Sequence, residues 1–175
     1  ADNLLINPAV AANDELANQV SNLETRTALF QGETLVAVRM PGEDLYSLDD
    51  NSNLPDKFLE LLAKCQPVNY DKPLVIIRHP WDIFLHNGDQ IQADYDLVTR
   101  NRTSQTITDI HTRTYGDERI FVEEGVDIKA AVINAESGPV YLGKNTTVHE
   151  NAIIKGPFAM LQGAHVNMGA KIREA

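Results

Sequence analysis

The strongest constraint on the fold of this chain is a period of six residues near its C-terminal end. An α-helix repeats every 3.6 residues and a strand every two, so neither produces this spacing. A chain that runs straight, turns a corner and runs straight again does produce it, as in hexapeptide solenoids. The six aliphatic residues at this interval are Leu142, Val148, Ile154, Met160, Val166 and Ile172.

Turn-favouring residues repeat with the same period. One stands three positions after each of the first five aliphatic residues. Asn and Gly accept left-handed backbone angles, and Pro fixes a bend. The next residue is small, except for Phe158, which we expect a neighbouring gap to accommodate. The turn residues are Asn145, Asn151, Pro157, Gly163 and Gly169, and those that follow them are Thr146, Ala152, Phe158, Ala164 and Ala170.

Upstream, the period continues with one interruption. Val122 and Ile128 are six apart, and Gly125 stands at the corner between them. Residues 134–139 then break the phase, and we interpret them as a loop that bulges from one corner, because insertions in solenoids form such loops. The alternative is a set of ordinary short strands joined by turns.

The first hundred residues mix the patterns of strands and helices. We expect a short strand at 4–6, a helix opened by Asn7-Pro8, a hairpin of 27–30 with 34–40, and a helix that begins at Pro55. A short apolar run at 74–77 indicates another strand, and Pro80 opens a second long helix. The apolar face expected for the helix after Pro8 is Val10, Leu16, Val20 and Leu23, and that for the helix after Pro80 is Trp81, Phe84, Ile91, Tyr95 and Val98.

Residues 99–119 show no apolar period and are rich in Thr, Arg, Asn and Asp. This predicts an α/β region at 1–100, a linker at 101–118 and a solenoid at 119–175. The net charge of −10 argues against nucleic acid as a partner. Residues 142–175 carry four basic side chains against two acidic ones, a balance that suits an anionic small ligand.

The cellular compartment can be inferred from the lack of a membrane span and of a secretory signal in the sequence, and from its single cysteine. No apolar run is long enough to cross a membrane, and no basic-then-apolar stretch resembles a secretory signal. Cys65 cannot form an internal disulfide, and we expect it to be a buried residue of the helix that begins at Pro55. A cytoplasmic location is therefore expected.

The segment Pro80-Trp81-Asp82-Ile83-Phe84, with Asn87 shortly after it and hexads further on, resembles the junction of the GlmU-like sugar-1-phosphate nucleotidyltransferases. Residues 120–125, 138–144, 156–159 and 167–172 also resemble the start of the β-helix in that group. The resemblance covers most of residues 74–175. It implies part of a nucleotidyltransferase-like α/β domain, followed by the first coils of a left-handed parallel β-helix with three hexads per turn.

The resemblance also implies a reaction and its partners. A nucleoside triphosphate and a sugar-1-phosphate would be joined with Mg²⁺, and the β-helix would transfer an acyl group from a donor such as acyl-CoA or form a homo-oligomer, a trimer in this group. Asn87 matches the linker residue that helps to hold Mg²⁺ in this family, and an amide oxygen suits that cation. The alternative for Asn87-Gly88 is a turn or a helix end. We expect Asp82 to cap the linker helix.

The chain lacks the glycine-rich phosphate loop of such enzymes, since no Gly-x-Gly occurs in it. We therefore expect an internal fragment that is inactive alone, with no catalytic residue of its own to nominate. The rival hypothesis is a degenerate, non-catalytic transferase-like module that assembles through its β-helix, so whether the chain is an enzyme stays open. An uncapped last coil, with Met160, Val166 and Ile172, predicts self-association.

The remaining polar residues form no recognisable catalytic pattern. None of the five histidines has the spacing of a metal site. His149 and His165 flank aliphatic hexad positions, so we expect both to point outward, His149 being either a catalytic or a solvated side chain. The acidic pairs Asp49-Asp50 and Glu123-Glu124 are expected to be solvated.

Overall fold

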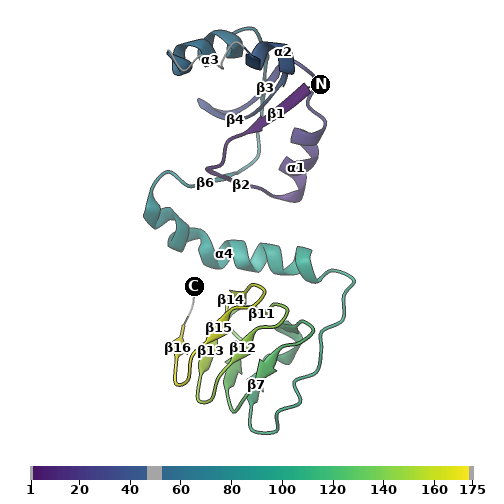
Figure 1. Ribbon diagram of the computed structural model, residues 1–175, viewed down its shortest axis with the longest axis vertical. Coiled ribbons are helices and arrows are strands. Elements are labelled where there is room, and N and C mark those ends of the chain that lie inside the picture. The colour runs from purple at the N-terminus through teal and green to yellow at the C-terminus, as the bar shows by residue number, and fades with distance from the viewer. Residues whose placement is uncertain (1, 47–52, 174–175) are drawn as a thin grey trace. The chain divides into compact units, whose positions relative to one another are not determined.

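The computed structural model describes residues 2–46 and 53–173 (Figure 1). It divides into two compact units, residues 1–80 and 81–175, which are described separately. The first unit is α/β, and the second joins a long helix to stacked parallel strands. This confirms the predicted fold class. The domain boundary near residues 100–118 stays a prediction.

The first unit is built on a mixed sheet of strands β1 (Asp2–Ile6), β4 (Thr34–Pro41), β3 (Thr27–Gln31) and β5 (Gln66–Asn69), in the order β1-β4-β3-β5. Strand β4 runs antiparallel to both β1 and β3, whereas β3 and β5 are parallel. The predicted hairpin of β3 and β4 is confirmed. Buried side chains lie on both faces of β4, so helices must cover both sides of the sheet.

Helix α1 (Asp14–Ser21) covers one face, and it begins later than the sequence predicted. Asn13 caps it, because the Asn13 side chain accepts a hydrogen bond from the Leu16 N–H at 2.8 Å. The expected start at Asn7-Pro8 is wrong, since Asn7 Oδ1 closes a local turn with the Ala9 N–H. The residues after that turn form strand β2 (Val10–Ala11), which pairs with β6 (Val75–Ile76).

Helices α2 (Gly42–Leu45) and α3 (Leu54–Leu62) lie at the other face of the sheet. Helix α3 carries Pro55 in its first turn, as predicted, but it ends before Cys65. The expectation that Cys65 is a buried helical residue is therefore wrong. Its thiol is partly buried, and burial raises its pKa, which makes it a poor nucleophile.

The second unit begins with helix α4 (Pro80–Thr99), which starts at the predicted proline. Its expected apolar face is only partly covered. Ile91 and Tyr95 are half-buried, whereas Trp81 and Phe84 near its start are exposed by 52% and 64%.

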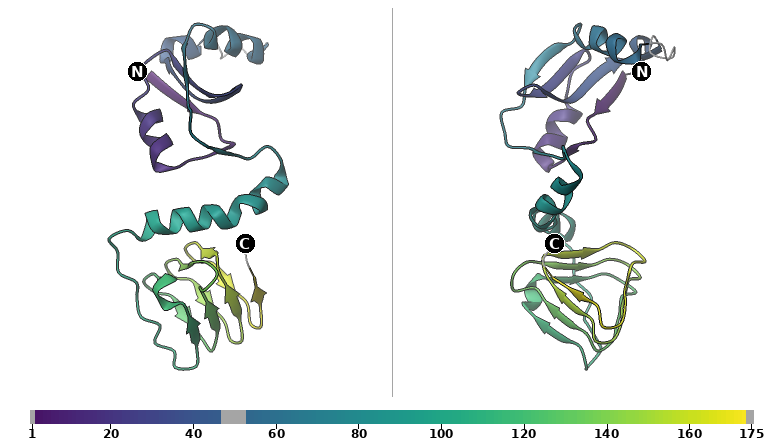
Figure 2. Two further views of the ribbon diagram at one scale, coloured as in Figure 1. Left: turned by 180° about the vertical axis from the view of Figure 1, so that it is seen from behind. Right: turned by 90° about the vertical axis from the view of Figure 1, so that its left-hand side faces the viewer.

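The strands after residue 112 form a parallel β-helix with three walls, and the right-hand view of Figure 2 looks roughly along the stack of coils. Wall 1 contains β8 (Ile120–Val122), β11 (Val140–Leu142) and β14 (Phe158–Met160). Wall 2 contains β9 (Asp127–Ile128), β12 (Thr147–Val148) and β15 (His165–Val166). Wall 3 contains β7 (Arg113–Tyr115), β10 (Val132–Asn134), β13 (Ile153–Lys155) and β16 (Lys171–Ile172), and a 3₁₀ turn, η2 (Asp117–Arg119), precedes β8.

The register of the later coils confirms three hexads per turn. Val140 pairs with Phe158, Thr147 with His165 and Ile153 with Lys171, each pair being 18 residues apart. Five of the six aliphatic hexad residues are buried in one continuous core, and Ile172 is partly buried against it. The half-buried Phe158 also packs on this core.

The earlier coil is longer, because residues 134–139 add a loop between wall 3 and wall 1, as predicted. A second irregularity was missed. Ile133 follows the inward residue Ile128 by five positions rather than six, so the corner between them is one residue shorter. Ala130 occupies this corner with a φ of 46°, where the next coil has Asn151 with a φ of 61°.

The corners yield a prediction about stability. A left-handed angle costs about 1 kcal/mol for a residue with a Cβ, so Ala130→Gly should raise the free energy of unfolding by up to that amount. Gly125→Ala should lower it, because Gly125 has a φ of 75° and an added Cβ would lie 2.2 Å from the Asn145 Oδ1. Chemical denaturation of both variants checks this. Equal effects of the two substitutions would contradict the assigned corners.

A second prediction concerns Tyr70, which is 2% exposed in the core between α1 and the sheet. Within the described residues its hydroxyl has no hydrogen-bond partner. An unsatisfied buried hydroxyl costs about 1–3 kcal/mol, so Tyr70→Phe should stabilise the first unit. The matched control is Tyr46→Phe, since Tyr46 is 76% exposed and should tolerate the change without effect. A loss of stability in Tyr70→Phe, measured by thermal unfolding, would show that the hydroxyl is hydrogen-bonded.

Candidate functional site

One edge of the first sheet gathers the carboxyl ends of three strands. Because β4 is antiparallel to β1 and β3, and β3 is parallel to β5, the strands β1, β3 and β5 all run in one direction. In open α/β sheets, ligands bind outside the carboxyl ends of the strands. Asn7 follows β1 at this edge, and Gln31 and Asn69 end β3 and β5.

A cavity of about 260 Å³ opens beside the carboxyl end of β1. Its walls are mainly apolar, and the residues that line it are Leu5, Ile6, Asn7, Pro8, Leu35, Ala37, Val38 and Phe58. The Asn7 side chain holds the wall together, since its Nδ2 donates to the Leu35 carbonyl at 2.8 Å and its Oδ1 accepts from Ala9. The cavity therefore has an apolar interior with a fixed amide at its rim, an arrangement that is common in ligand sites.

Two cationic residues lie near the same edge. The Lys72 carbonyl accepts a hydrogen bond from Gln31 Nε2 at 2.5 Å, and the Lys72 ammonium pairs with Glu15, which raises the Lys72 pKa. Arg78 Nη2 donates to the Thr34 hydroxyl at 3.4 Å. The charge of Lys72 is thus balanced by Glu15, and neither cation lines the cavity, whose apolar walls suit the ring of a ligand.

Asn87, the predicted magnesium ligand, lies exposed in the interior of helix α4. The alternative that Asn87-Gly88 is a turn or a helix end is therefore wrong. Across the described part of the chain, no group of three or more His, Cys, Asp or Glu side chains is placed to hold a metal. Asn87 would supply one oxygen ligand, and its metal role stays a prediction. The expectation that Asp82 caps the helix is wrong, because α4 begins at Pro80 and Asp82 lies within its first turn, where an acidic residue offsets the helix dipole.

A buried polar cluster joins the end of α4 to wall 1 of the β-helix. Glu123 is 7% exposed and accepts hydrogen bonds from Arg102 Nη2 at 2.6 and 2.7 Å and from the Tyr141 hydroxyl at 2.6 Å. The Phe121 ring stacks on Tyr141 at 5.9 Å, and the Arg102 guanidinium lies 5.2 Å from the centre of the Phe121 ring. The expectation that Glu123 is solvated is wrong, although Glu124 is exposed.

The chemistry of this cluster is structural rather than catalytic. The hydrogen bonds from Tyr141 and Arg102 lower the Glu123 pKa and keep its carboxylate charged. Burial and the contact with Glu123 raise the Tyr141 pKa, so Tyr141 remains a protonated donor. The sequence held one signal of this arrangement, because Phe121 and Tyr141 both occupy outward positions on neighbouring strands.

The sequence was compared with models of known protein families, with curated proteins and with solved structures. Residues 1–103 match the family described as sugar nucleotidyl transferase. The chain belongs to the sugar nucleotidyl transferase family. No curated protein matches the chain, and no solved structure matches it.

In this sugar nucleotidyl transferase family member, the matched residues include the whole first unit, helix α4 and Arg102 of the buried cluster. The strand-edge cavity and Asn87 both fall within the match. The β-helix lies outside it. No helix among the described residues is long and apolar enough to cross a membrane.

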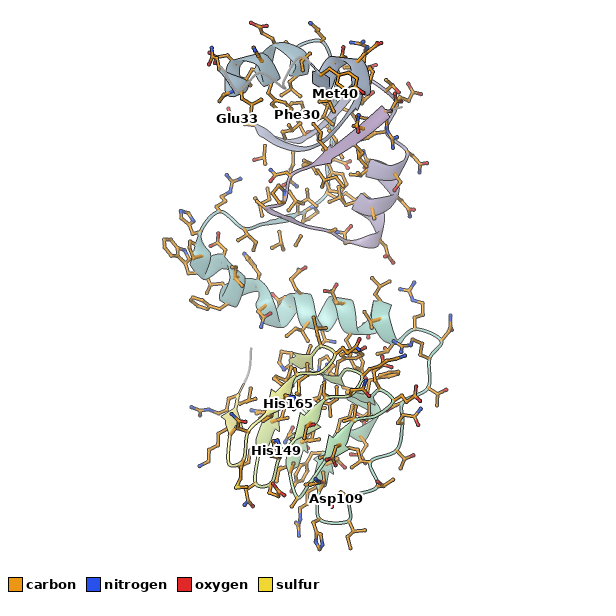
Figure 3. The ribbon with its side chains drawn as sticks, viewed as in Figure 1. Phe30, Glu33, Met40, Asp109, His149 and His165 are labelled. Carbon is orange, nitrogen blue, oxygen red and sulfur yellow. The ribbon has the colours of Figure 1, made fainter. Side chains whose placement is uncertain are left out.

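The histidines of the β-helix lie as predicted. His165, on strand β15, is exposed, and His149, which directly follows strand β12, is half-exposed; Figure 3 labels both on the β-helix. No partner that would make His149 a general base is seen among the described residues, so the solvated alternative is favoured. The Asp49-Asp50 pair lies outside the described residues.

The buried cluster predicts how stability depends on pH. A carboxylate whose pKa is lowered by folding contributes stability above its unfolded pKa, and this contribution disappears as the pH falls through the folded pKa. The second unit should therefore lose stability on acidification below about pH 4.5, the ordinary value for Glu123. Glu123→Gln should be less stable at pH 7, and the difference from wild type should shrink at low pH.

Urea denaturation at several pH values provides the measurement. Glu124→Gln is the matched control, since Glu124 is exposed beside Glu123. A constant difference between Glu123→Gln and wild type from pH 7 to pH 3 would refute the proposed charge state.

Proposed function

We propose that this chain belongs to an enzyme that joins a sugar-1-phosphate to a nucleoside triphosphate, forming a nucleoside-diphosphate sugar and releasing pyrophosphate. The family match over residues 1–103 is the observation that carries the proposal. The cavity at the carboxyl edge of the sheet supports it, because it lies within the matched residues and its apolar walls and the Asn7 amide suit the ring of a substrate.

In this reaction, an oxygen of the sugar phosphate attacks the α-phosphorus of the triphosphate, and pyrophosphate leaves with the electron pair of the broken P–O bond. Proteins promote such transfers mainly by positioning the reactants and offsetting the charge of the phosphates. The apolar wall of the cavity, which includes Phe58, would contact a ring of the substrate.

We further propose that Mg²⁺ assists the transfer and that Asn87 is one of its protein ligands. The donor chemistry fits, because Mg²⁺ prefers oxygen and usually takes few protein ligands besides water and phosphate oxygens. The bound cation would neutralise phosphate charge. Asn87 itself would hold an amide oxygen at a fixed position on a helix.

For the β-helix, we propose acyl transfer from a donor such as acyl-CoA or the assembly of a homo-oligomer, and for the protein a cytoplasmic location. The cationic excess of residues 142–175 supports an anionic donor. Because the chain contains no Gly-x-Gly phosphate loop, residues 1–175 alone should not catalyse the nucleotidyl transfer.

The test is pyrophosphate release by the full protein, measured with a panel of nucleoside triphosphates and sugar-1-phosphates at varied Mg²⁺. Asn87→Ala should weaken the apparent Mg²⁺ affinity by roughly 10-fold or more, an effect typical of lost support at a metal site. Asp94→Ala is the control, since Asp94 is exposed on the same helix and should leave the Mg²⁺ dependence unchanged.

Two outcomes would contradict the proposal at different levels. Unchanged Mg²⁺ dependence in Asn87→Ala would remove the metal role alone. The absence of product with every substrate pair, from a protein that is folded by circular dichroism, would favour a degenerate module that assembles through its β-helix.

A further inference from the structure

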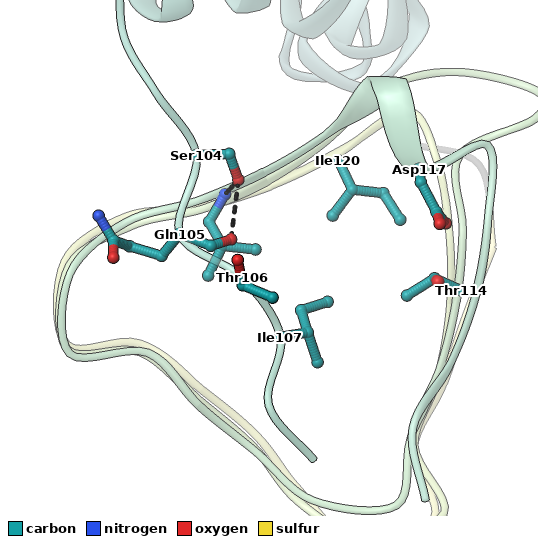
Figure 4. A pocket seen from close by; sticks show the side chains of 8 residues that line it. Ser104, Gln105, Thr106, Ile107, Thr114, Asp117 and Ile120 are labelled. Atoms are coloured by element: carbon teal, nitrogen blue, oxygen red, sulfur yellow. Dashed lines mark hydrogen bonds between the residues drawn. The ribbon is translucent and has the colours of Figure 1, made fainter. Parts of the chain in front are cut away.

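A second cavity, of about 260 Å³, lies between the first coil of the β-helix and the segment that precedes it, residues 102–112. All the residues that line it belong to the second unit. In Figure 4, Ile107 and Ile120 lie in its middle, Thr114 and Asp117 lie on one side, and Ser104 lies on the other. The cavity therefore has an apolar middle with polar groups around it.

The segment that closes this cavity is held in place by hydrogen bonds to the first coil. The Ser104 hydroxyl oxygen accepts from the Val122 N–H at 2.9 Å, and the Gln105 N–H donates to the Val122 carbonyl at 2.8 Å. Further along the segment, the Asp109 carboxylate accepts from the Ala130 N–H at 2.9 Å. Because these bonds fix the segment against the coil, the cavity is a preformed part of the fold, as ligand sites usually are.

The cavity lies where the first coil departs from the aliphatic pattern of the interior. Thr114 pairs with Ile133, Ile133 with Ile154, and Ile154 with Ile172, so all four share one inward position of wall 3. Ile133 and Ile154 are fully buried, whereas Thr114 is half-buried and lines the cavity. Threonine is smaller than isoleucine and carries a hydroxyl, so it leaves space and adds a polar group. A residue that breaks the packing pattern in this way is expected at a functional site.

The charge around the cavity favours a cation. Asp117 contributes an exposed carboxylate, and no lysine or arginine is among the described residues that line the cavity. Within the described part of the chain, neither the Asp117 carboxylate nor the Thr114 hydroxyl has a hydrogen-bond or ion-pair partner. Two acceptors are thus available at the same side of the cavity, and an anionic ligand would meet no opposite charge there.

We propose that this cavity is a binding site for a small organic cation, namely an ammonium group on a short hydrocarbon chain or ring. The ammonium would donate hydrogen bonds to the Asp117 carboxylate and to the Thr114 hydroxyl oxygen. The hydrocarbon would be buried against Ile107, which packs on the core, and against Ile120. The cavity is smaller than the pockets that hold drug-sized molecules, so the ligand has only a few carbon atoms.

This site is separate from the proposed nucleotidyl transfer. It lies outside the residues of the strand-edge cavity, and its negative charge disfavours nucleotides, sugar phosphates and acyl-CoA, which are anions. Failure of either proposal would therefore leave the other unaffected.

The test titrates three probes of equal length into the full chain: n-butylammonium, n-butanol and butyrate. NMR spectroscopy follows the isoleucine methyl groups and the backbone amides. n-Butylammonium should shift the methyl signals of Ile107 and Ile120 and the amide signals of Thr114 and Asp117, and the shifts should saturate. n-Butanol should bind more weakly because it lacks the charge, and butyrate should bind most weakly because Asp117 repels it.

Two substitutions separate the contributions of charge and space. Asp117→Asn should weaken n-butylammonium binding by about 3-fold, the scale of one exposed ion pair, and should leave n-butanol binding unchanged. Thr114→Ile should fill the cavity, abolish the binding of both probes and stabilise the second unit. The matched control is Glu118→Gln, because Glu118 is exposed in the same turn as Asp117 but does not line the cavity.

Three results would overturn the proposal. Binding of butyrate as tight as that of n-butylammonium would show that the site does not select a cation. Shifts that spread over the chain without saturation would show non-specific adsorption. Unchanged binding in a folded Thr114→Ile variant would place the probe elsewhere. If Thr114→Ile does not fold, Asp117→Asn decides, since an unchanged affinity for n-butylammonium in that variant also contradicts the proposal.

Discussion

The narrow interior of the β-helix is the constraint on which the second unit depends. Each coil must place an aliphatic side chain inward on each wall, and it must turn a corner between walls. Leu142, Val148 and Ile154 are fully buried because they occupy these inward positions in one coil. Their neighbours along each strand then point outward, which leaves the outer surface of the walls available for other roles.

On wall 1, the outward-pointing side chains form the polar cluster around Glu123. Phe121, Glu123 and Tyr141 cannot contribute to the interior, yet they are buried or partly buried because they contact one another and Arg102. A charged carboxylate is tolerated there because both of its oxygens are hydrogen-bonded. The family match ends at residue 103, beside this cluster. Helix α4, which carries Asn87, thus ends three residues before Arg102, the residue that contacts Glu123 of the β-helix.

The sequence allowed the repetitive part of the fold to be predicted well. A period of six appears in a single sequence because every coil obeys the same steric rule, and Asn145 and Asn151 mark corners because few residues accept left-handed angles. The corner at Ala130 was not predicted, because alanine rarely adopts left-handed backbone angles. In addition, Ile133 follows Ile128 by five residues rather than six, which interrupts the period.

The first unit and the candidate site were harder to predict from the sequence, because both depend on contacts between residues that are distant along the chain. Asn7-Pro8 and Asn13 are both plausible helix starts, and the choice between them depends on the pairing of β2 with a strand more than sixty residues away. The cavity beside β1 unites Leu5, Leu35 and Phe58, which are distant in sequence. The burial of Glu123 depends on Arg102 and Tyr141, and no local pattern reveals such a contact.

The parallel β-helix requires that its coils stack at intervals of 18 residues. NMR spectroscopy tests it directly through nuclear Overhauser effects between backbone protons of neighbouring strands. Cross-peaks are predicted between Val140 and Phe158, Thr147 and His165, and Ile153 and Lys171. Helical contacts within residues 140–172, or the pattern of antiparallel hairpins in place of these pairs, would contradict it.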